Sequence, residues 1–282
     1  MINADVVRAW RTDPGRQKYA NRDVILYALG AGAGASAEDL PFVYEAKLKA
    51  LPTMAVVLAG EGFWMRDPKT GIDWKKLLHG EQRLSLHRAL PSEGEVVSQM
   101  KVTGLYDRGA GKGAALTLER ELRDAESGDL IAVAGMTAML MGDGGFGGSA
   151  EGMPKANPVP ERAPDMTIDM ETRADQALIY RLSGDYNPLH IDPEIAQYAG
   201  FDRPILHGLC SYAIAGRAIL RALCNDEPDR LKQLDVRFSS PVFPGETLSI
   251  DIWREGEGMA AFRARVAARN VTALNNGFAR FE

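Results

Sequence analysis

The chain has 282 residues, of which 45% are hydrophobic and 25% charged, as in an ordinary globular protein of one large or two modest domains. This composition excludes disorder, a collagen-like repeat or a mucin-like stalk for most of the chain. The formal net charge of −5 argues against a nucleic-acid-binding protein, but it leaves room for a small basic groove that binds an anionic ligand.

In the first part of the chain, helical segments precede strand-like ones. We expect a helical segment at residues 23–29 and a short apolar helix at residues 52–60. A further strand-like stretch contains His87, for which a structural role is expected. Apolar runs then predict three more strands and a hairpin turn, at residues 96–105, 114–122, 130–141 and 124–129.

Residues 142–164 break this pattern with the sequence GDGGFGGSAEGMPKANPVPERAP. Glycine frees the backbone and proline prevents regular pairing, so this stretch predicts a linker. A phosphate-binding role for its glycines is disfavoured, because no Lys-Ser/Thr pair and no helix start follow them.

The second part repeats the order of the first. A helix is expected at residues 208–223, where four small residues would let a sheet approach closely: Ala213, Ala215, Gly216 and Ala218. Strands are predicted at residues 234–238, 247–253, 260–267 and 272–281, with a hairpin turn at 255–258. Two short matches between the parts, at nearly one sequence offset, suggest a duplicated unit. A helix followed by a strand meander predicts an α+β protein with the sheet wrapped round the helix.

Residues 180–208 contain the side chains best suited to chemistry. Asp185 and His190 lie five residues apart, so a helix would separate them, and Pro188 disfavours helical geometry at Asn187. The segment therefore predicts a turn that brings the two side chains together. Such a pair suits general acid–base chemistry, because imidazole titrates near neutral pH. The alternative is a buried Asp–His hydrogen bond that only fixes the turn.

Two neighbouring features have structural alternatives as well. Asp192 is expected to cap a short helix that ends near residue 200. A metal site built from Asp185, Asn187, His190 and Asp192 has no recognisable ligand spacing, so no metal is expected.

The apolar helix opens with His207-Gly208, and its first amides carry partial positive charge without internal partners. Gly208 would admit a ligand oxygen close to the backbone, as in an oxyanion hole. Relief of crowding at the helix start explains the glycine equally well, so both interpretations stay open.

Several segments together resemble the MaoC-like hydratases, in particular the hydratase 2 unit of peroxisomal multifunctional enzyme type 2. The second part contributes GDYNPLHID at 184–192, AGF at 199–201 and RPILHGL at 203–209. The first part contributes RDVILYALGAGA at 22–33, FVYE at 42–45, LHGEQ at 78–82 and GGFGG at 144–148. The resemblance therefore covers nearly the whole chain.

This resemblance implies two hot-dog folds in tandem, each an antiparallel sheet wrapped round a central helix. The N-terminal hot-dog domain would span residues 1–141, the linker 142–164, and the C-terminal domain with the hydratase motif 165–282. The implied activity is reversible hydration of trans-2-enoyl-CoA to (3R)-3-hydroxyacyl-CoA, with no metal or redox cofactor.

The resemblance also implies roles for individual residues. Asp185 and His190 match the catalytic pair, Gly208 the oxyanion amide, and Asn187 a residue that orients the pair. Glu45 matches a glutamate regarded as important in the family. The positions implied for substrate binding are His79, Gly80, Arg108, Tyr186, Pro188, Leu189 and Phe238. Arg108 stands where a lysine is expected, which keeps the cation but changes its geometry.

The first part lacks the catalytic motif, because Gly32 and Ala37 stand opposite Asp185 and His190. One active site is therefore expected, and the N-terminal domain is predicted to be an acyl-chain chamber beside its short central helix. The alternatives are a hydratase or dehydratase for a specialised non-fatty acyl-CoA, and a non-catalytic acyl-CoA-binding protein.

The expected setting is the cytoplasm. Cys210 and Cys224 are too few for a secreted disulfide scaffold. The start of the chain does not resemble a signal peptide, the most apolar run is too short to span a bilayer, and the last three residues are not a Ser-Lys-Leu peroxisomal address. The expected partner is an acyl-CoA thioester, with no nucleic acid or membrane and with a homodimer as one possible assembly.

Overall fold

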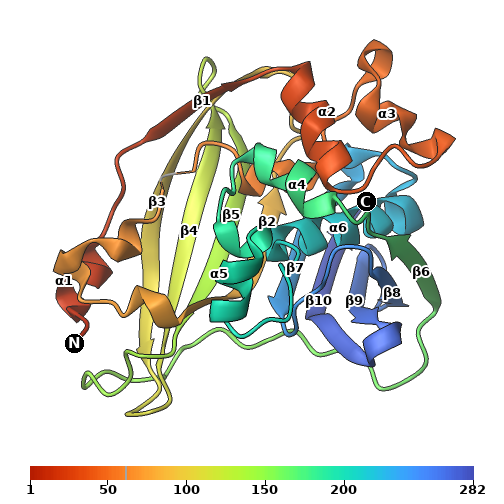
Figure 1. Cartoon of the computed structure of the whole chain (residues 1–282). Helices are drawn as coiled ribbons and strands as arrows, with labels where there is room; N and C mark the ends of the chain where they lie inside the picture. Colours follow the sequence, from red (N-terminus) through yellow and green to blue (C-terminus); the bar gives the residue numbers. More distant parts are fainter. Residues whose placement is uncertain (61) are drawn as a thin grey trace.

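The structure is a computed structural model that describes residues 1–60 and 62–282. In these residues ten strands form one antiparallel sheet, in the order β1-β3-β4-β5-β2-β7-β10-β9-β8-β6 (Figure 1). The strands are β1 (Gly15–Tyr19), β2 (Leu77–Leu86), β3 (Gly94–Asp107), β4 (Ala114–Asp124), β5 (Leu130–Leu140), β6 (Met166–Glu171), β7 (Leu231–Phe238), β8 (Thr247–Arg254), β9 (Met259–Val266) and β10 (Val271–Phe281).

The helices lie mostly before the strands of each half. They are α1 (Ala4–Ala9), α2 (Asn21–Gly30), α3 (Leu40–Val43), α4 (Gln176–Tyr180), α5 (Pro193–Tyr198) and α6 (Gly208–Cys224). The 3-10 turns are η1 (Ala37–Asp39), η2 (Glu45–Lys47), η3 (Pro52–Val56), η4 (Trp64–Arg66), η5 (Pro68–Thr70), η6 (Trp74–Lys76), η7 (Arg181–Ser183), η8 (Pro188–His190), η9 (Pro228–Arg230) and η10 (Ala267–Arg269).

The sheet consists of two similar halves. Read inward from each edge, the strand orders β1-β3-β4-β5-β2 and β6-β8-β9-β10-β7 are equivalent, as a duplicated unit predicts. The halves meet where β2 pairs with β7, from Glu81 opposite Arg237 to Ser85 opposite Gln233. Figure 1 shows the strands of the second half continuing the sheet of the first. This is the tandem hot-dog arrangement that the resemblance implies.

The predicted central strands are confirmed, whereas the edge strands β1 and β6 were missed. β1 is only five residues long and reads GRQKY, so its charged side chains hide any apolar alternation. Short, charged strands are typical of sheet edges, where they discourage pairing with other chains. Sequence patterns based on apolar periodicity therefore do not detect them.

The core of the second half is α6, which the sheet wraps closely. Thirteen of its residues are buried, among them Ala213, Ala215 and Ala218, which have no exposed surface. A Cβ added at Gly216 would lie 2.8 Å from Thr53 Cγ2 and 3.2 Å from a Leu234 methyl group. The small residues that the sequence singled out thus allow the sheet and η3 to touch the helix.

The central helix of the first half is reduced to the single 3-10 turn η3, shorter than the predicted helix. Buried Arg120 on β4 donates hydrogen bonds to the carbonyl groups of Ala55, Val56 and Leu58, which occupy the end of this turn. Part of the remaining sheet face is covered by α1 and by η4–η6, which form a second apolar cluster with β3, β4 and β5.

The segment between β5 and β6 contains no helix or strand, as the predicted linker requires. Its glycine amides are used within the protein: the Asp107 carboxylate accepts hydrogen bonds from the amides of Gly145, Gly147 and Gly148. These hydrogen bonds, that of Gly145 foremost, lower the pKa of Asp107. The chain's own carboxylate therefore occupies the place that a phosphate would take.

Candidate active site

The catalytic turn, defined as residues 184–190, is shaped by its own polar groups. Gly184 has a φ of 118°, and η8 begins after Asn187. The Asn187 side-chain oxygen accepts a hydrogen bond from the backbone amide of Leu189 at 3.2 Å. The backbone amide of Asn187 donates to Asp185 Oδ1, also at 3.2 Å. Asn187 thus lies between the two members of the pair in the turn and contacts the Asp185 carboxylate, whereas its predicted role in orienting the pair stays a prediction. The turn predicted from Pro188 is confirmed.

His190 is buried, and its hydrogen bond defines its protonation. Its Nδ1 lies 2.9 Å from the carbonyl oxygen of Ile205. A carbonyl oxygen only accepts, so Nδ1 carries the hydrogen and Nε2 keeps a free lone pair. Burial lowers the pKa of His190, and the Ile205 hydrogen bond and the charge of Asp185 oppose this only partly. His190 is therefore a neutral base near pH 7.

The N-terminus of α6 faces the same region. Gly208 is the first residue of this 17-residue helix, so its amide has no intrahelical acceptor and lies at the positive end of the helix dipole. A Cβ at this position would lie 3.2 Å from Phe238 Cε1. A side chain at this position would crowd the Phe238 ring, and Gly208 itself is exposed, so relief of crowding and an accessible oxyanion amide both stay open as interpretations of the glycine.

His207 is part of the site, although the sequence analysis treated it only as the residue before Gly208. Its ring stacks on that of His190, with centroids 3.8 Å apart and planes at 30°. Its Nε2 lies 3.1 Å from the backbone carbonyl oxygen of Asp185. Burial, and next the neighbouring His190, lower the pKa of His207 to about 4. Its position beside the candidate oxyanion amide was the signal that could have identified it.

The opposite wall comes from the junction of the two halves. His79 on β2 and Phe238 on β7 contact each other, with ring centroids 4.7 Å apart. The β2–β5 register shifts at Gly80, where a Cβ would lie 2.8 Å from Met139 Cγ. Burial lowers the pKa of His79 to about 4, and its Nε2 is buried without a hydrogen-bond partner among the described residues.

Two cavities lie next to these residues. One, of about 270 Å³, is lined by Gly80, Arg108 and Phe238 together with Met153 and Pro154 of the linker. The structure thus brings together three residues that the sequence assigned to substrate binding.

The second cavity, of about 220 Å³, extends from Gly184 and Tyr186 of the catalytic turn to the end of η3. Its apolar lining comes mainly from the first half: Leu26, Met54, Val57 and Leu58.

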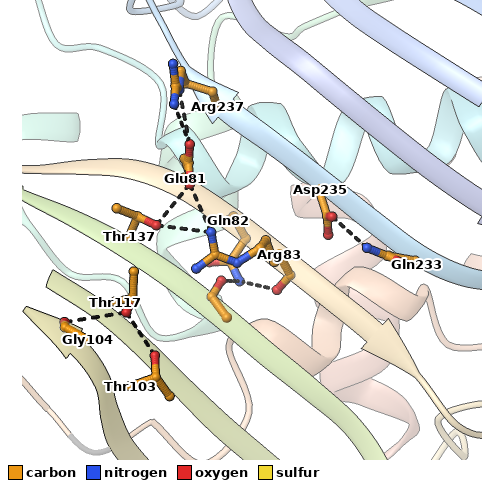
Figure 2. Close-up of polar contacts among 11 residues, drawn as sticks. Glu81, Gln82, Arg83, Thr103, Gly104, Thr117, Thr137, Gln233, Asp235 and Arg237 are labelled. Atoms are coloured by element: carbon orange, nitrogen blue, oxygen red, sulfur yellow. Dashed lines mark hydrogen bonds and ion pairs between the residues drawn. The ribbon is translucent and has the colours of Figure 1, made fainter. Parts of the chain in front are cut away.

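At the wall of the first cavity, ion pairs and hydrogen bonds connect the two halves (Figure 2). Glu81 on β2 accepts two hydrogen bonds from Arg237 on β7, the shorter at 2.7 Å. Its other carboxylate oxygen accepts from Arg83 at 2.9 Å and from Thr137 at 3.0 Å. Since Phe238 follows Arg237 and Gly80 precedes Glu81, this network supports the wall of the site.

Three further predicted residues line neither of the two cavities. Glu45 is exposed on η2, and among the described residues no hydrogen bond or ion pair connects it to the catalytic turn or to Gly208. Pro188 and Leu189 are the first residues of η8, where they shape the turn. The roles of these three residues, like those of the other predicted site residues, stay predictions.

Asp185, His190 and His207 each place a potential ligand atom within 4.8 Å of the other two. The same distance allows one water molecule to contact both Asp185 and His190. A metal ion fits less well, because imidazole ligands point their lone pairs in the ring plane at about 2.0–2.1 Å. Two stacked rings whose planes differ by 30° do not direct lone pairs at one such point.

Comparison with known proteins agrees with this geometry. Residues 17–142 match the model described as the MFE-2 hydratase 2 N-terminal domain, and residues 155–276 match the MaoC like domain. The chain belongs to the MaoC-like dehydratase family. It is 45% identical to 3-hydroxyacyl-thioester dehydratase Y of Mycobacterium tuberculosis, over 91% of this chain and 89% of that protein. It is 38% identical to peroxisomal enoyl-CoA hydratase 2 of Arabidopsis thaliana, over 97% and 94%.

Solved structures support the fold of this MaoC-like protein. A MaoC-like dehydratase from Phytophthora capsici superimposes with a TM-score of 0.88 at 35% identity, over 100% of this chain and 99% of the other. A Mycobacterium tuberculosis protein described as a double hotdog fold matches with a TM-score of 0.58 at 13% identity, over 99% of this chain and 97% of that one. The predicted tandem hot-dog fold is therefore confirmed.

Proposed function

We propose that this MaoC-like protein catalyses the reversible hydration of trans-2-enoyl-CoA to (3R)-3-hydroxyacyl-CoA. One observation carries the proposal. The Asp185 carboxylate and a ring nitrogen of His190 lie within 4.8 Å, a distance that one water molecule can bridge, and Gly208 begins α6 in the same region. The relatives named enoyl-CoA hydratase 2 support the same activity.

The geometry suggests a catalytic role for each residue. The water oxygen bonds to C3 of the enoyl group while His190 Nε2 takes one of its protons. Charge then develops on the thioester oxygen, where the Gly208 amide would stabilise it; such a donor is worth about 10²–10³ in kcat. The proton held by the Asp185–His190 pair passes to C2, so that one water molecule is added in total. Asp185 holds the water, and Asn187 orients the pair.

The two cavities suggest where the rest of the substrate lies. The cavity lined by Arg108 and Phe238 would take the coenzyme A side of the thioester, because it carries a cation and its Phe238 ring lies beside Gly208. The second cavity would take the acyl tail along its apolar side chains Met54 and Val57, and polar groups of Gln17, Asp23 and Ser183 line the rest of it. The chamber predicted in the N-terminal domain is thus limited to the space beside η3, since α1 and η4–η6 cover another part of that sheet face.

The test is the loss of enoyl absorbance with trans-2-enoyl-CoA substrates of short, medium and long chain. An (R)-specific dehydrogenase, coupled to the assay, reads the configuration of the product. We expect Asp185→Asn and His190→Ala to lower kcat by about 10²- to 10⁴-fold, the usual contribution of general acid–base groups, with unchanged circular dichroism. Near-normal turnover in either variant would contradict the assignment, and an (S) product would contradict the proposed stereochemistry.

The reverse direction is the second candidate, because a relative at 45% identity is named a 3-hydroxyacyl-thioester dehydratase. The same residues serve both directions. Assays that start from (3R)-3-hydroxyacyl thioesters, including non-fatty acyl groups, separate a specialised dehydratase from a general hydratase. Tight binding without turnover in either direction would favour the non-catalytic acyl-CoA-binding protein.

The proposal needs no metal or redox cofactor, and dialysis against EDTA should leave the activity unchanged.

We also propose that the enzyme works in the cytoplasm, a setting in which its two buried cysteines would stay free thiols. None of the helices in the described part of the chain has the length and apolar character of a bilayer span. A homodimer remains part of the proposal, to be tested by light scattering.

A further inference from the structure

We propose that His207 is a positioning residue, which acts through the hydrogen bond between its Nε2–H and the backbone carbonyl of Asp185. This hydrogen bond joins the catalytic turn to the first residues of α6. The inference rests on the proposed hydratase function, because it concerns how the Asp185–His190 pair and the Gly208 amide are held relative to each other.

The tautomer of His207 follows from its partner. The carbonyl oxygen of Asp185, 3.1 Å away, only accepts, so Nε2 of His207 carries the hydrogen. In the neutral ring Nδ1 is then unprotonated, and it is buried without a hydrogen-bond partner among the described residues. A residue that served only for packing would not need this nitrogen, since a phenyl ring of similar shape buries no unpaired acceptor. The ring is therefore retained for its Nε2–H.

His207 contacts each part of the site at once. Its own carbonyl accepts hydrogen bonds from the amides of Cys210 and Ser211, both at 3.1 Å, and so starts α6. Its side chain has no exposed surface and contacts the catalytic turn at two points, the Asp185 carbonyl and the His190 ring. A shift of His207 would move the turn relative to the Gly208 amide.

A second hydrogen bond, from the His190 side chain to a backbone carbonyl, also holds the turn. His190 Nδ1–H donates to Ile205, two residues before His207. Residues 205–207 thus accept a hydrogen bond from one end of the catalytic turn and donate one to the other. Without the His207 donor, the Asp185 end of the turn would lose its hydrogen bond to this segment, and the Asp185 carboxylate would move relative to the His190 ring.

Two substitutions separate the hydrogen bond from the stacking. His207→Phe keeps a ring over His190 but removes the donor, whereas His207→Gln keeps an N–H donor at the place of Nε2 but removes the ring. His87→Gln is the matched control, because His87 is exposed after β2 and distant from the site in the chain. Each variant is purified as the full chain, its fold is checked by circular dichroism, and kcat and KM are measured separately.

We expect His207→Phe to lower kcat by about 10- to 100-fold with KM within about 3-fold, as for a small misplacement of catalytic groups. His207→Gln should recover kcat to within about 5-fold of the wild type, and His87→Gln should equal it. Equal losses in both His207 variants, a smaller loss in His207→Phe, or no loss in either would overturn the inference. If His207→Phe does not fold, a His207→Gln kcat below a tenth of the wild type decides against it.

A second readout does not depend on turnover. In nitrogen-15 NMR spectra of histidine-labelled protein, wild-type His207 should give the neutral Nε2–H form at pH 7, and His190 the Nδ1–H form. His190 should keep this form in both variants, because its Nδ1–H bond to Ile205 does not involve His207. The backbone amide of Tyr186, whose peptide group contains the Asp185 carbonyl, should shift in His207→Phe and return towards the wild-type position in His207→Gln. An unchanged Tyr186 amide in His207→Phe would contradict the positioning role even if the wild type hydrates no enoyl-CoA, so the two proposals fail separately.

Discussion

Burial, more than any charged partner, sets the pKa of His190. His190 has 9% of its surface exposed, and the single N–H of its neutral ring donates to a backbone carbonyl. Charging it would place a cation in a poorly solvated site, and the charge of Asp185 offsets this cost only in part. The neutral form with a free Nε2 is therefore favoured near pH 7, as a base that accepts a proton from water requires.

This state predicts the pH dependence of the reaction. Since the pKa of His190 is lowered, the base stays unprotonated until the pH falls below the ordinary imidazole value of about 6.5. The acidic limb of kcat/KM should therefore have its midpoint below pH ~6.5, and activity should fall as the pH decreases through it. The measurement is the pH profile with one enoyl-CoA, with His87→Gln as the control. A midpoint above 6.5 would show that another group, or a different environment of His190, sets this limb.

At the scale of elements, the two halves differ in how their central helix ends. α6 runs for 17 residues, whereas η3 ends at Val56, where Arg120 binds the carbonyl groups of Ala55 and Val56. The Gln17 side chain accepts a hydrogen bond from the amide of Ala59, which has a positive φ of 50° and turns the chain away. The short turn leaves the second cavity between η3 and the catalytic turn.

Removal of Arg120 should weaken this part of the fold. Arg120→Met leaves three carbonyl groups without their charged donor, and each unsatisfied buried group costs about 1–3 kcal/mol. We expect a loss of about 2–4 kcal/mol in the free energy of unfolding, since water will reach some of these groups. Arg120→Lys, which cannot bind all three carbonyls, should recover part of it. Urea denaturation measures both variants; an unchanged midpoint for Arg120→Met would show that the carbonyls find other donors.

The whole molecule depends on contacts between its halves. Besides the β2–β7 pairing, the buried carboxylate of Asp39 accepts hydrogen bonds from Arg217 of α6 at 2.6 Å and Arg221 at 3.0 Å. Arg217 also donates to the carbonyl of Ala31, in the first-half segment that stands opposite the catalytic turn in the repeat. A structural ion pair beside this glycine-rich segment is consistent with a single active site per chain.

Asp39→Ala tests this contact. The substitution leaves Arg217 buried without its carboxylate, so the free energy of unfolding should fall by about 3–5 kcal/mol. Replacing both residues, as Asp39→Leu with Arg217→Met, should recover much of the loss, because no unpaired charge remains. Thermal and urea unfolding measure the effect. A loss below 1 kcal/mol in Asp39→Ala would show that water or another group solvates Arg217.

The same pair predicts a pH effect on stability. Burial alone would raise the pKa of Asp39, but the charge and hydrogen bond of Arg217 outweigh it and lower that pKa. The contribution of Asp39 is therefore complete above the unfolded value of about 3.9 and is lost as the pH falls through the lower folded value. Asp39→Ala should show a shallower loss of stability in that acidic range than the wild type.

The sequence by itself determined much of the fold. Apolar runs located the inner strands and α6, Asp192 capped α5 as predicted by accepting from the amides of Glu194 and Ile195, and the motifs around residue 190 identified the family. These features are local, because periodicity, caps and turn residues act over a few neighbouring positions. They predicted the inner strands, the catalytic turn and the linker, and the resemblance that the motifs carry implied the tandem fold.

Only the tertiary structure decided which distant residues share one site. His207 joined the catalytic pair because α6 packs behind the turn, and Gly80 met Phe238 because β2 pairs with β7. Glu45, which a family motif alone had singled out, lies exposed on η2. The use of glycine amides by Asp107 and the shortening of η3 by Arg120 likewise depend on contacts between distant segments. Such contacts depend on burial and the directions of side chains in three dimensions, which no periodicity along the chain records.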